Sequence, residues 1–216
     1  MTRYRREAAG DEISGTSSLR TRVGPIPIEA PIWNRFFTVA PLVLVGTKEA
    51  DGRFDVAPKH MAMPLGWGNY YCFACSPRHG THVNAARHGE FTVSFPRPEM
   101  VVQASMAAGG RLPDGSKPSL AALSTFPANA VEGVLVEGCY LFLECRLERI
   151  VEGFGDNSLV IGEIVAASAE EAAVRVSDAD DAELIRAQPL LAYIQPGRFA
   201  SIGESLSFPF PADFRP

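Results

Sequence analysis

Long apolar runs and basic tracts are both missing from this sequence. The most apolar segment, "FFTVAPLVLVG", is 11 residues long and contains a proline, whereas a membrane-spanning helix needs about 20 apolar residues. The N-terminal segment "MTRYRREAAGDEISGTSSLR" is polar, so it lacks the apolar stretch of a secretory signal. A net charge of -5 argues against a general nucleic-acid surface, which needs a basic excess. The sequence therefore predicts a soluble, cytoplasmic protein that binds neither membranes nor nucleic acids.

Cysteine is scarce, and its spacing fits no common zinc site. Cys72 and Cys75 form a C-x-x-C inside "YYCFACS", but this segment has a strand pattern, and strand residues three apart point to opposite faces. Cys139 and Cys145 are also too far apart for a zinc knuckle. We expect four buried, reduced cysteines, with a zinc site or a disulfide as the less favoured alternatives.

Internal repeats, low-complexity tracts and a G-x-G-x-x-G motif are absent as well. Together with the lack of long helices between strands, this argues against a doubly wound dinucleotide-binding sheet. The chain of 216 residues, 46% of them apolar, is long enough for one full-sized core. The polar and then proline-rich residues 1–30 are predicted to form an N-terminal arm, and residues 31–216 a single domain.

Short apolar runs with alternating or β-branched patterns predict roughly six to eight strands. They fall at 42–47, 54–58, 70–76, 90–96, 138–151, 159–168, 190–194 and 198–203. Asp51 and Gly52 predict a hairpin turn after the first strand. Short helices are expected at 81–89, 98–107 and 178–188, and a loop at 59–69. The predicted fold class is mainly β, an antiparallel barrel with short helices.

The stretch "SPRHGTHVN", Ser76–Asn84, places donors for an anion at the start of a predicted helix. Unpaired N–H groups at a helix N-terminus attract anions, and Arg78 adds a guanidinium that binds phosphate in a bidentate way. Gly80 allows close approach of the backbone. A plain polar loop is the main alternative. A metal site is less favoured, because the nearby histidines do not share one helical face.

A second candidate segment is "APKHMAMP", Ala57–Pro64, where a strand ends at the rim of the barrel. Lys59 and His60 are suited to contact a ligand there, and Met61 and Met63 offer soft surfaces for a flat aromatic ring. The alternative is that both methionines fill the core and that Lys59 is solvated.

Four segments, in this order, resemble the flavin reductase-like, FMN-binding split-barrel family: "PLVLVGTKEADGRFDVAPKHMAMP", "SPRHGTHVNAARHGEFTVSFP", "LECRLERIVEGFGDNSLVIGEIVAA" and "PLLAYIQPGRFASIGE". The resemblance runs from about Pro41 to Glu204. It implies an antiparallel FMN-binding split β-barrel that forms a homodimer, with FMN near the subunit interface.

The resemblance also implies which residues bind the cofactor. The FMN phosphate would contact Ser76, Arg78, His79 and Thr81, with Asn84 nearby. The isoalloxazine ring would lie along Ala57, Pro58, Lys59, His60, Met61 and Ala62. A positive Lys59 or a protonated His60 would favour negative charge on the flavin. We assign no catalytic residue and no metal ligand.

The activity implied is that of an FMN-binding oxidoreductase. It would accept hydride from NAD(P)H as a transient substrate and pass electrons to a flavin or another acceptor. Because the chain has no dinucleotide-binding motif, the nicotinamide would have to stack against an exposed flavin face. The alternative is an FMN-binding electron carrier without pyridine-nucleotide activity.

Overall fold

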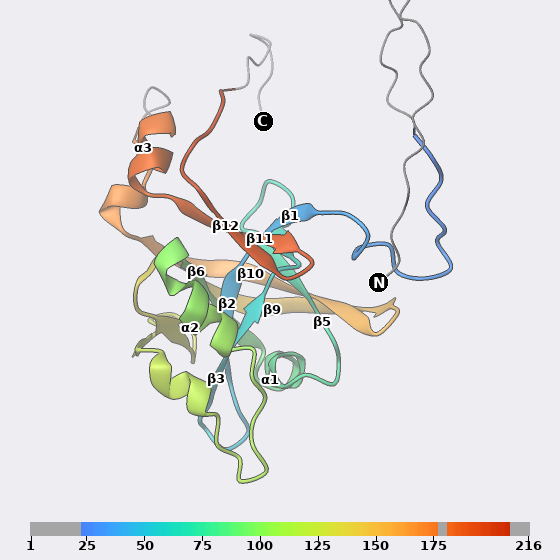
Figure 1. Ribbon diagram of the computed structural model, residues 1–216. Helices are drawn as coiled ribbons and strands as arrows, with labels where there is room; N and C mark the ends of the chain where they lie inside the picture. Colours follow the sequence, from blue (N-terminus) through green and yellow to red (C-terminus); the bar gives the residue numbers. More distant parts are fainter. Residues whose placement is uncertain (1–22, 177–180, 208–216) are drawn as a thin grey trace, which may run out of the picture. The chain divides into compact units, whose positions relative to one another are not determined.

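The computed structural model describes residues 23–176 and 181–207, and the chain divides into two units, Met1–Ile32 and Trp33–Pro216 (Figure 1). The described part of the first unit, residues 23–32, contains no helix or strand. Its function as an arm stays a prediction. All the helices and strands described below belong to the second unit.

The second unit is built around a seven-stranded antiparallel sheet in the order β3-β2-β6-β9-β10-β5-β4. The sheet is open between its first and last strands, so the predicted antiparallel split barrel is confirmed. Its strands are β2 (Val43–Lys48), β3 (Phe54–Lys59), β4 (Ala62–Pro64), β5 (Tyr70–Cys75), β6 (Glu90–Pro96), β9 (Cys139–Phe154) and β10 (Asn157–Ala169).

Two smaller sheets accompany the main one. The first has the order β1-β11-β12, from β1 (Thr38–Pro41), β11 (Leu190–Gln195) and β12 (Arg198–Ile202), and the second pairs β7 (Thr125–Pro127) with β8 (Val134–Val136). The α-helices are α1 (Gly80–His88), α2 (Val101–Met106) and α3 (Asp181–Ala187). Single turns of 3-10 helix lie at Pro98–Met100, Pro118–Ala122 and Glu171–Ala173. None of the described helices has the length and apolar character needed to cross a membrane.

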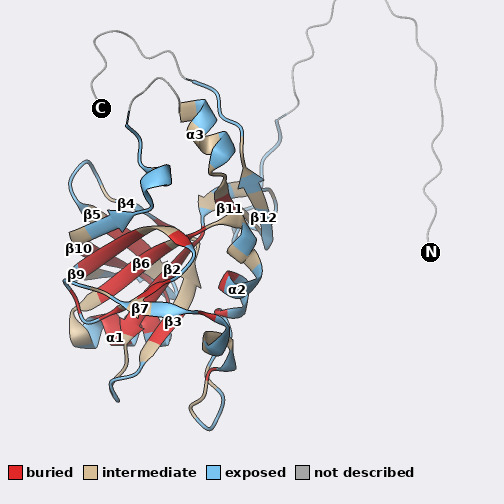
Figure 2. Cartoon of the chain, turned by 90° about the vertical axis from the view of Figure 1, so that its left-hand side faces the viewer, coloured by how far each residue is buried: buried red, intermediate tan, exposed pale blue. Residues whose placement is uncertain are grey.

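Buried residues gather on the central strands, as Figure 2 shows in red. Alternate residues of β2 point to two separate cores: Val43 and Val45 pack in one cluster, and Leu44 in the other. The strand is therefore buried on both faces, which explains its continuous apolar run. We estimate that each such fully buried side chain contributes about 1.5–3 kcal/mol by leaving water.

Strand β9 buries a charged side chain. Phe142 and Glu144 alternate with the apolar Leu141, Leu143 and Cys145, yet both of them are buried. The Glu144 carboxylate accepts hydrogen bonds from the backbone N–H groups of Asn129, Ala130 and Val131 at 3.0, 2.5 and 3.2 Å. A buried carboxylate is tolerated because these donors satisfy it.

Differences from the predicted elements are local. The predicted loop 59–69 contains β4, and β1, β7 and β8 were not predicted, because strands this short carry little pattern. Helix α1 begins one residue earlier than expected, with His79 at its N-cap, but it ends as predicted at Gly89, whose φ of 70° is left-handed. The predicted third helix begins at Asp181, and residues 178–180 lie outside the described residues.

The four cysteines are free and buried, as the sequence predicted. Burial raises the pKa of the Cys139 and Cys145 thiols to about 12. Within the residues described, no group of histidine, cysteine and acidic side chains is arranged to hold a metal ion.

Candidate functional site

Two neighbouring cavities lie where β3 ends and α1 begins. The larger has a volume of about 570 Å³, and the smaller about 180 Å³. Three residues, Pro58, Lys59 and His79, line both of them. The two segments that the sequence singled out therefore meet at the boundary between the cavities.

The N-terminus of α1 is built by a tight turn after β5. The His79 N–H donates to the Ser76 carbonyl at 3.0 Å, and the Arg78 N–H donates to Ser76 Oγ at 3.4 Å. No acidic residue lies in the first turn of α1 itself, and the nearby Asp55 carboxylate is paired with Lys117. Gly80, the first helical residue, has room for an added Cβ, since its nearest neighbour would be Asp55 Oδ2 at 4.0 Å. This is a cradle that an oxygen of an anion can fill.

Lys59 projects from the end of β3 toward this cradle. Its Nζ donates to Thr81 Oγ1 at 3.2 Å, which uses one of the three N–H groups of an ammonium. Burial lowers the pKa of Lys59, while the nearby Cys75 thiol and Asp55 carboxylate partly oppose this change. An anion placed against the cradle would stabilise the charged form of Lys59.

The inner wall of the larger cavity holds a buried ion pair. Lys117 Nζ donates to Asp55 Oδ1 at 2.8 Å and to the Val56 carbonyl at 2.9 Å, and only 4% of the Lys117 side chain is exposed. Asp55 thus pairs with Lys117 and also interacts electrostatically with Lys59. With two lysines around one carboxylate, this wall keeps a positive excess.

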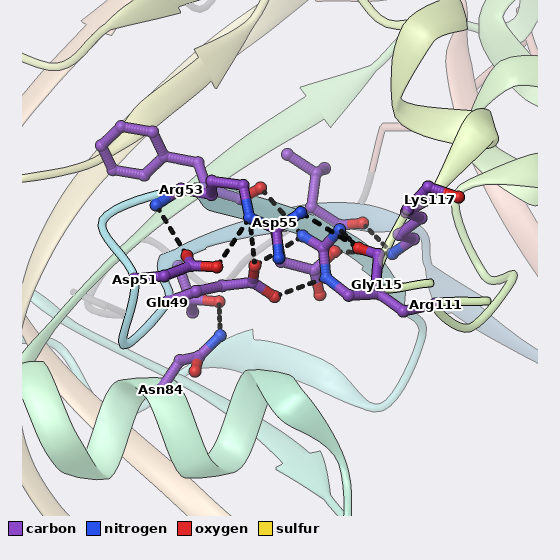
Figure 3. Close-up of polar contacts among 12 residues, drawn as sticks. Glu49, Asp51, Arg53, Asp55, Asn84, Arg111, Gly115 and Lys117 are labelled. Atoms are coloured by element: carbon purple, nitrogen blue, oxygen red, sulfur yellow. Dashed lines mark hydrogen bonds and ion pairs between the residues drawn. The ribbon is translucent and has the colours of Figure 1, made fainter. Parts of the chain in front are cut away.

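A second ion pair among the lining residues joins Arg111 and Glu49, and Figure 3 draws its contacts. Arg111 makes a two-point contact with Glu49, through Nε at 2.7 Å and Nη2 at 2.7 Å, and Nη1 donates to the Gly115 carbonyl at 2.9 Å. Arg53 shares both partners, since it contacts Glu49 at 3.9 Å and donates to Gly115 at 3.0 Å. Arg111 lines the cavity, whereas Arg53 is not part of its lining.

The structure brings most of the predicted site residues together. Those on the larger cavity are Ala57, Pro58, Lys59, Arg78 and His79, and those on the smaller are Pro58, Lys59, His60, Met61, Ser76 and His79. Thr81 is buried against Lys59.

Two of the predicted site residues lie elsewhere. Ala62 packs in the core, and the Asn84 amide donates to Thr47 Oγ1 at 3.2 Å, which ties α1 to β2.

Four lining residues, Glu49, Asp55, Arg111 and Lys117, were not predicted from the sequence. Asp55 gave one signal, a carboxylate inside the apolar strand "FDVAP", because a charge in such a place needs a partner. Nothing local pointed to Arg111 or Lys117 in the loop "AGGRLPDGSKP".

His60 packs on an aromatic ring and not in solvent. Its imidazole lies against Tyr193 with 4.3 Å between ring centroids. Burial, together with the charge of Lys59, lowers the pKa of His60 below its ordinary value of 6.5. The lowered pKa disfavours a protonated His60 at pH 7, and Lys59 is the other candidate for a positive group beside the ring segment.

The His60→Phe variant tests this pKa. Phenylalanine keeps a ring against Tyr193 but does not titrate. Since the folded state disfavours the proton, the unfolded chain binds it first as the pH falls through about 6.5. We expect the free energy of unfolding of the wild type, relative to that of the variant, to be constant above pH 7.5 and to fall toward pH 5.5. Urea unfolding at several pH values measures the free energy of unfolding of both proteins. If the wild type gains stability relative to the variant on acidification, the lowered pKa is contradicted.

Comparisons with known proteins agree with this fold. An uncharacterized protein of Methanothermobacter thermautotrophicus is 32% identical over 130 residues, which cover 58% of this chain and 61% of that protein, less than two thirds of its length. Nitrilotriacetate monooxygenase component B from Bacillus cereus has a similar fold, with a TM-score of 0.73 and 19% identity over 88% of this chain and 100% of that one. Flavoredoxin from Methanosarcina acetivorans also has a similar fold, with a TM-score of 0.71 and 21% identity over 89% of this chain and 97% of that one.

The model of one protein family, the flavin reductase like domain, matches residues 35–201. This range contains both cavities and the whole of the main sheet. The chain belongs to the flavin reductase like domain family.

Proposed function

We propose that this protein is an FMN-binding flavoprotein oxidoreductase that takes hydride from NAD(P)H and passes electrons to a flavin or another acceptor. Family membership supports a flavin-related reductase role. The observation that carries FMN is the cradle at the N-terminus of α1, because Lys59 and Arg78 bring positive charge to a helix end with room at Gly80. This combination suits a phosphate monoester.

The residues divide between the two ends of the ligand. Lys59, Arg78 and the backbone at Gly80 would hold the phosphate, with Thr81 orienting Lys59. The segment around His60 and Met61, on the smaller cavity, would contact the ring. Bound FMN supplies the hydride and electron chemistry, and the protein supplies binding and electrostatics. Asn84 is left out of this set, because its amide is engaged with Thr47.

Burial disfavours the charged forms of two side chains at the ring segment, His60 and Cys75. Neutral His60 presents one N–H donor and one nitrogen acceptor. Burial raises the pKa of the Cys75 thiol, which lines the smaller cavity, so Cys75 stays protonated near pH 7 and does not act as a thiolate nucleophile. Lys59 would provide the positive charge that favours electron density on the flavin.

We also propose that the protein forms a homodimer. Met61, Met63, Trp67 and Val39 are apolar yet exposed in the single chain, and exposed apolar surface of this kind favours association. A mass of a single 23.3 kDa chain by light scattering at micromolar concentration would contradict the proposal.

The visible spectrum tests the function directly. The purified chain, loaded with FMN, should show a bound-flavin spectrum that NADH or NADPH bleaches in the absence of oxygen. A chain that takes up no FMN would overturn the proposal. If FMN binds and only dithionite bleaches it, the protein is instead an FMN-binding electron carrier.

The Arg78→Ala variant tests the phosphate site. The Arg78 side chain is 77% exposed and lies 3.5 Å from Asp156, so we expect a loss of only about tenfold in FMN affinity, near the lower end for a charge-assisted pair. Isothermal titration calorimetry measures the affinity. Arg87→Ala removes the same charge from the opposite end of α1 and should leave the affinity unchanged. Equal losses in both variants would show only a general charge effect.

A further inference from the structure

A separate cavity lies against α3, and the function proposed above makes no use of it. Residues of β9, α3 and β11 line it, among them Tyr140, Leu184 and Leu190. None of its lining residues lines either cavity of the candidate site. Its volume of about 240 Å³ is below the range of about 300–1,000 Å³ that holds a drug-sized molecule. The cavity therefore suits a smaller ligand.

One face of α3 is turned toward this cavity. Leu184 and Ile185, with Gln188 just past the end of the helix, have the spacing of a single helical face, and all three line the cavity. Each is only half-buried, and no residue of α3 is fully buried. The apolar side of α3 thus stands over open space, where its side chains lack part of the dispersion contacts that close packing gives. An apolar ligand would supply these contacts.

The polar groups that remain available on this cavity are mainly donors. Arg97 has only 14% of its side chain exposed, donates through Nη2 to Glu170, and lies over the Tyr140 ring with Cζ 5.1 Å from the centroid. A guanidinium has five N–H groups, so donors are left over. In the part of the chain that the structure describes, no hydrogen bond engages the Tyr140 hydroxyl or the Gln188 side-chain amide.

The carboxylate of the cavity is already engaged. Asp181 accepts two hydrogen bonds from Arg175, at 2.8 and 2.9 Å. Burial raises the pKa of Tyr140, with Arg97 partly opposing this change, so the hydroxyl keeps its proton near pH 7 and can donate. Donors therefore outnumber the free acceptors, and the group that complements them is an oxygen anion. A carboxylate matches the fork of an arginine best among small organic anions without phosphorus.

We propose that this cavity binds a small aromatic carboxylate. Its carboxylate accepts from Arg97 and the Tyr140 hydroxyl, and its ring packs against the apolar side of α3 and Leu190. A ring suits the space because it is rigid and offers a large apolar surface at little cost in conformational freedom. The proposal stands whether or not the protein binds a flavin.

The experiment follows the fluorine resonance of 4-fluorophenylacetate, which broadens on binding, during titration with the full-length chain. Excess inorganic phosphate in the buffer competes for the donors at the start of α1. The neutral 4-fluorophenylacetamide has the same shape without the charge. We expect the acid to bind at least about tenfold more tightly than this amide, because it makes a charge-assisted pair.

Two variants place the probe in the cavity. Arg97→Gln should weaken the acid about tenfold and leave the amide unchanged, and Arg146→Gln, which removes the same charge outside the cavity, should change neither. Leu184→Trp fills the space and should weaken both compounds about tenfold. Val102→Trp is its control, because Val102 is exposed on α2 and does not line the cavity, and it should weaken neither. Circular dichroism confirms that each variant is folded.

The inference is overturned if the acid does not bind, if acid and amide bind equally, or if binding survives both cavity variants. Binding of the acid that weakens as the phosphate concentration is raised would place the probe at α1, which overturns the inference as well. Because no flavin takes part in the titration, each of these results would leave the proposed function untouched.

Discussion

Replacing Lys117 with methionine is expected to lower the free energy of unfolding by about 3–5 kcal/mol, the cost of leaving one member of a buried ion pair without its partner. In the variant, Asp55 keeps its charge inside the protein, and the Val56 carbonyl loses its donor. Methionine has nearly the volume of the lysine stem, so packing changes little. Urea unfolding followed by circular dichroism gives the value.

A double variant separates the ion pair from packing. Lys117→Met combined with Asp55→Asn removes both charges, so it should recover a large part of the lost stability. Lys48→Met breaks the more exposed pair with Glu132 and should cost less than about 1 kcal/mol. If the Lys117 variant loses no more than the Lys48 variant, the pair is solvated in solution and does not form the inner wall of the larger cavity.

The parts of the fold that the sequence predicted are those with local signals. Asp51 and Gly52 set the β2–β3 hairpin by turn chemistry, and Gly89 ends α1 because its left-handed φ suits glycine. Strand β6 follows from strict alternation of apolar residues. Each of these signals lies within a few residues of the structure that it predicts, so no knowledge of distant contacts was needed.

The candidate site was predicted only where it depends on such local signals. The cradle at α1 follows from residues close together in the sequence, but Lys117 reaches Asp55 across 62 positions. Outside the site, Glu144 is a similar case, because the backbone N–H groups that satisfy its buried carboxylate lie 13 to 15 residues earlier in the chain. A polar side chain whose partner is brought in by the fold looks like a solvated one in the sequence. The lowered pKa of His60 also depends on burial and on a neighbour's charge, which residue type alone does not give.

Gly80→Ala is expected to weaken FMN binding roughly 5- to 150-fold, about 1–3 kcal/mol, by filling the space that the phosphate would occupy. The folded protein has room for this methyl group, because its nearest neighbour is Asp55 Oδ2 at 4.0 Å and the Gly80 backbone is not left-handed. The free energy of unfolding should therefore stay constant or rise by about 0.5–1 kcal/mol, since alanine suits a helix better than glycine. A loss of affinity without a loss of stability identifies a space kept open for a ligand.

Riboflavin makes this test specific to the phosphate, because it has the ring and ribityl chain of FMN without the phosphate. Calorimetric titration should show that Gly80→Ala reduces the affinity for FMN much more than that for riboflavin. Gly203→Ala is the matched control, because its added methyl is also accommodated, 3.9 Å from Pro189, outside both cavities. If Gly80→Ala weakens riboflavin and FMN equally, the ring and not the phosphate lies against the start of α1, and the proposed orientation of the cofactor is reversed.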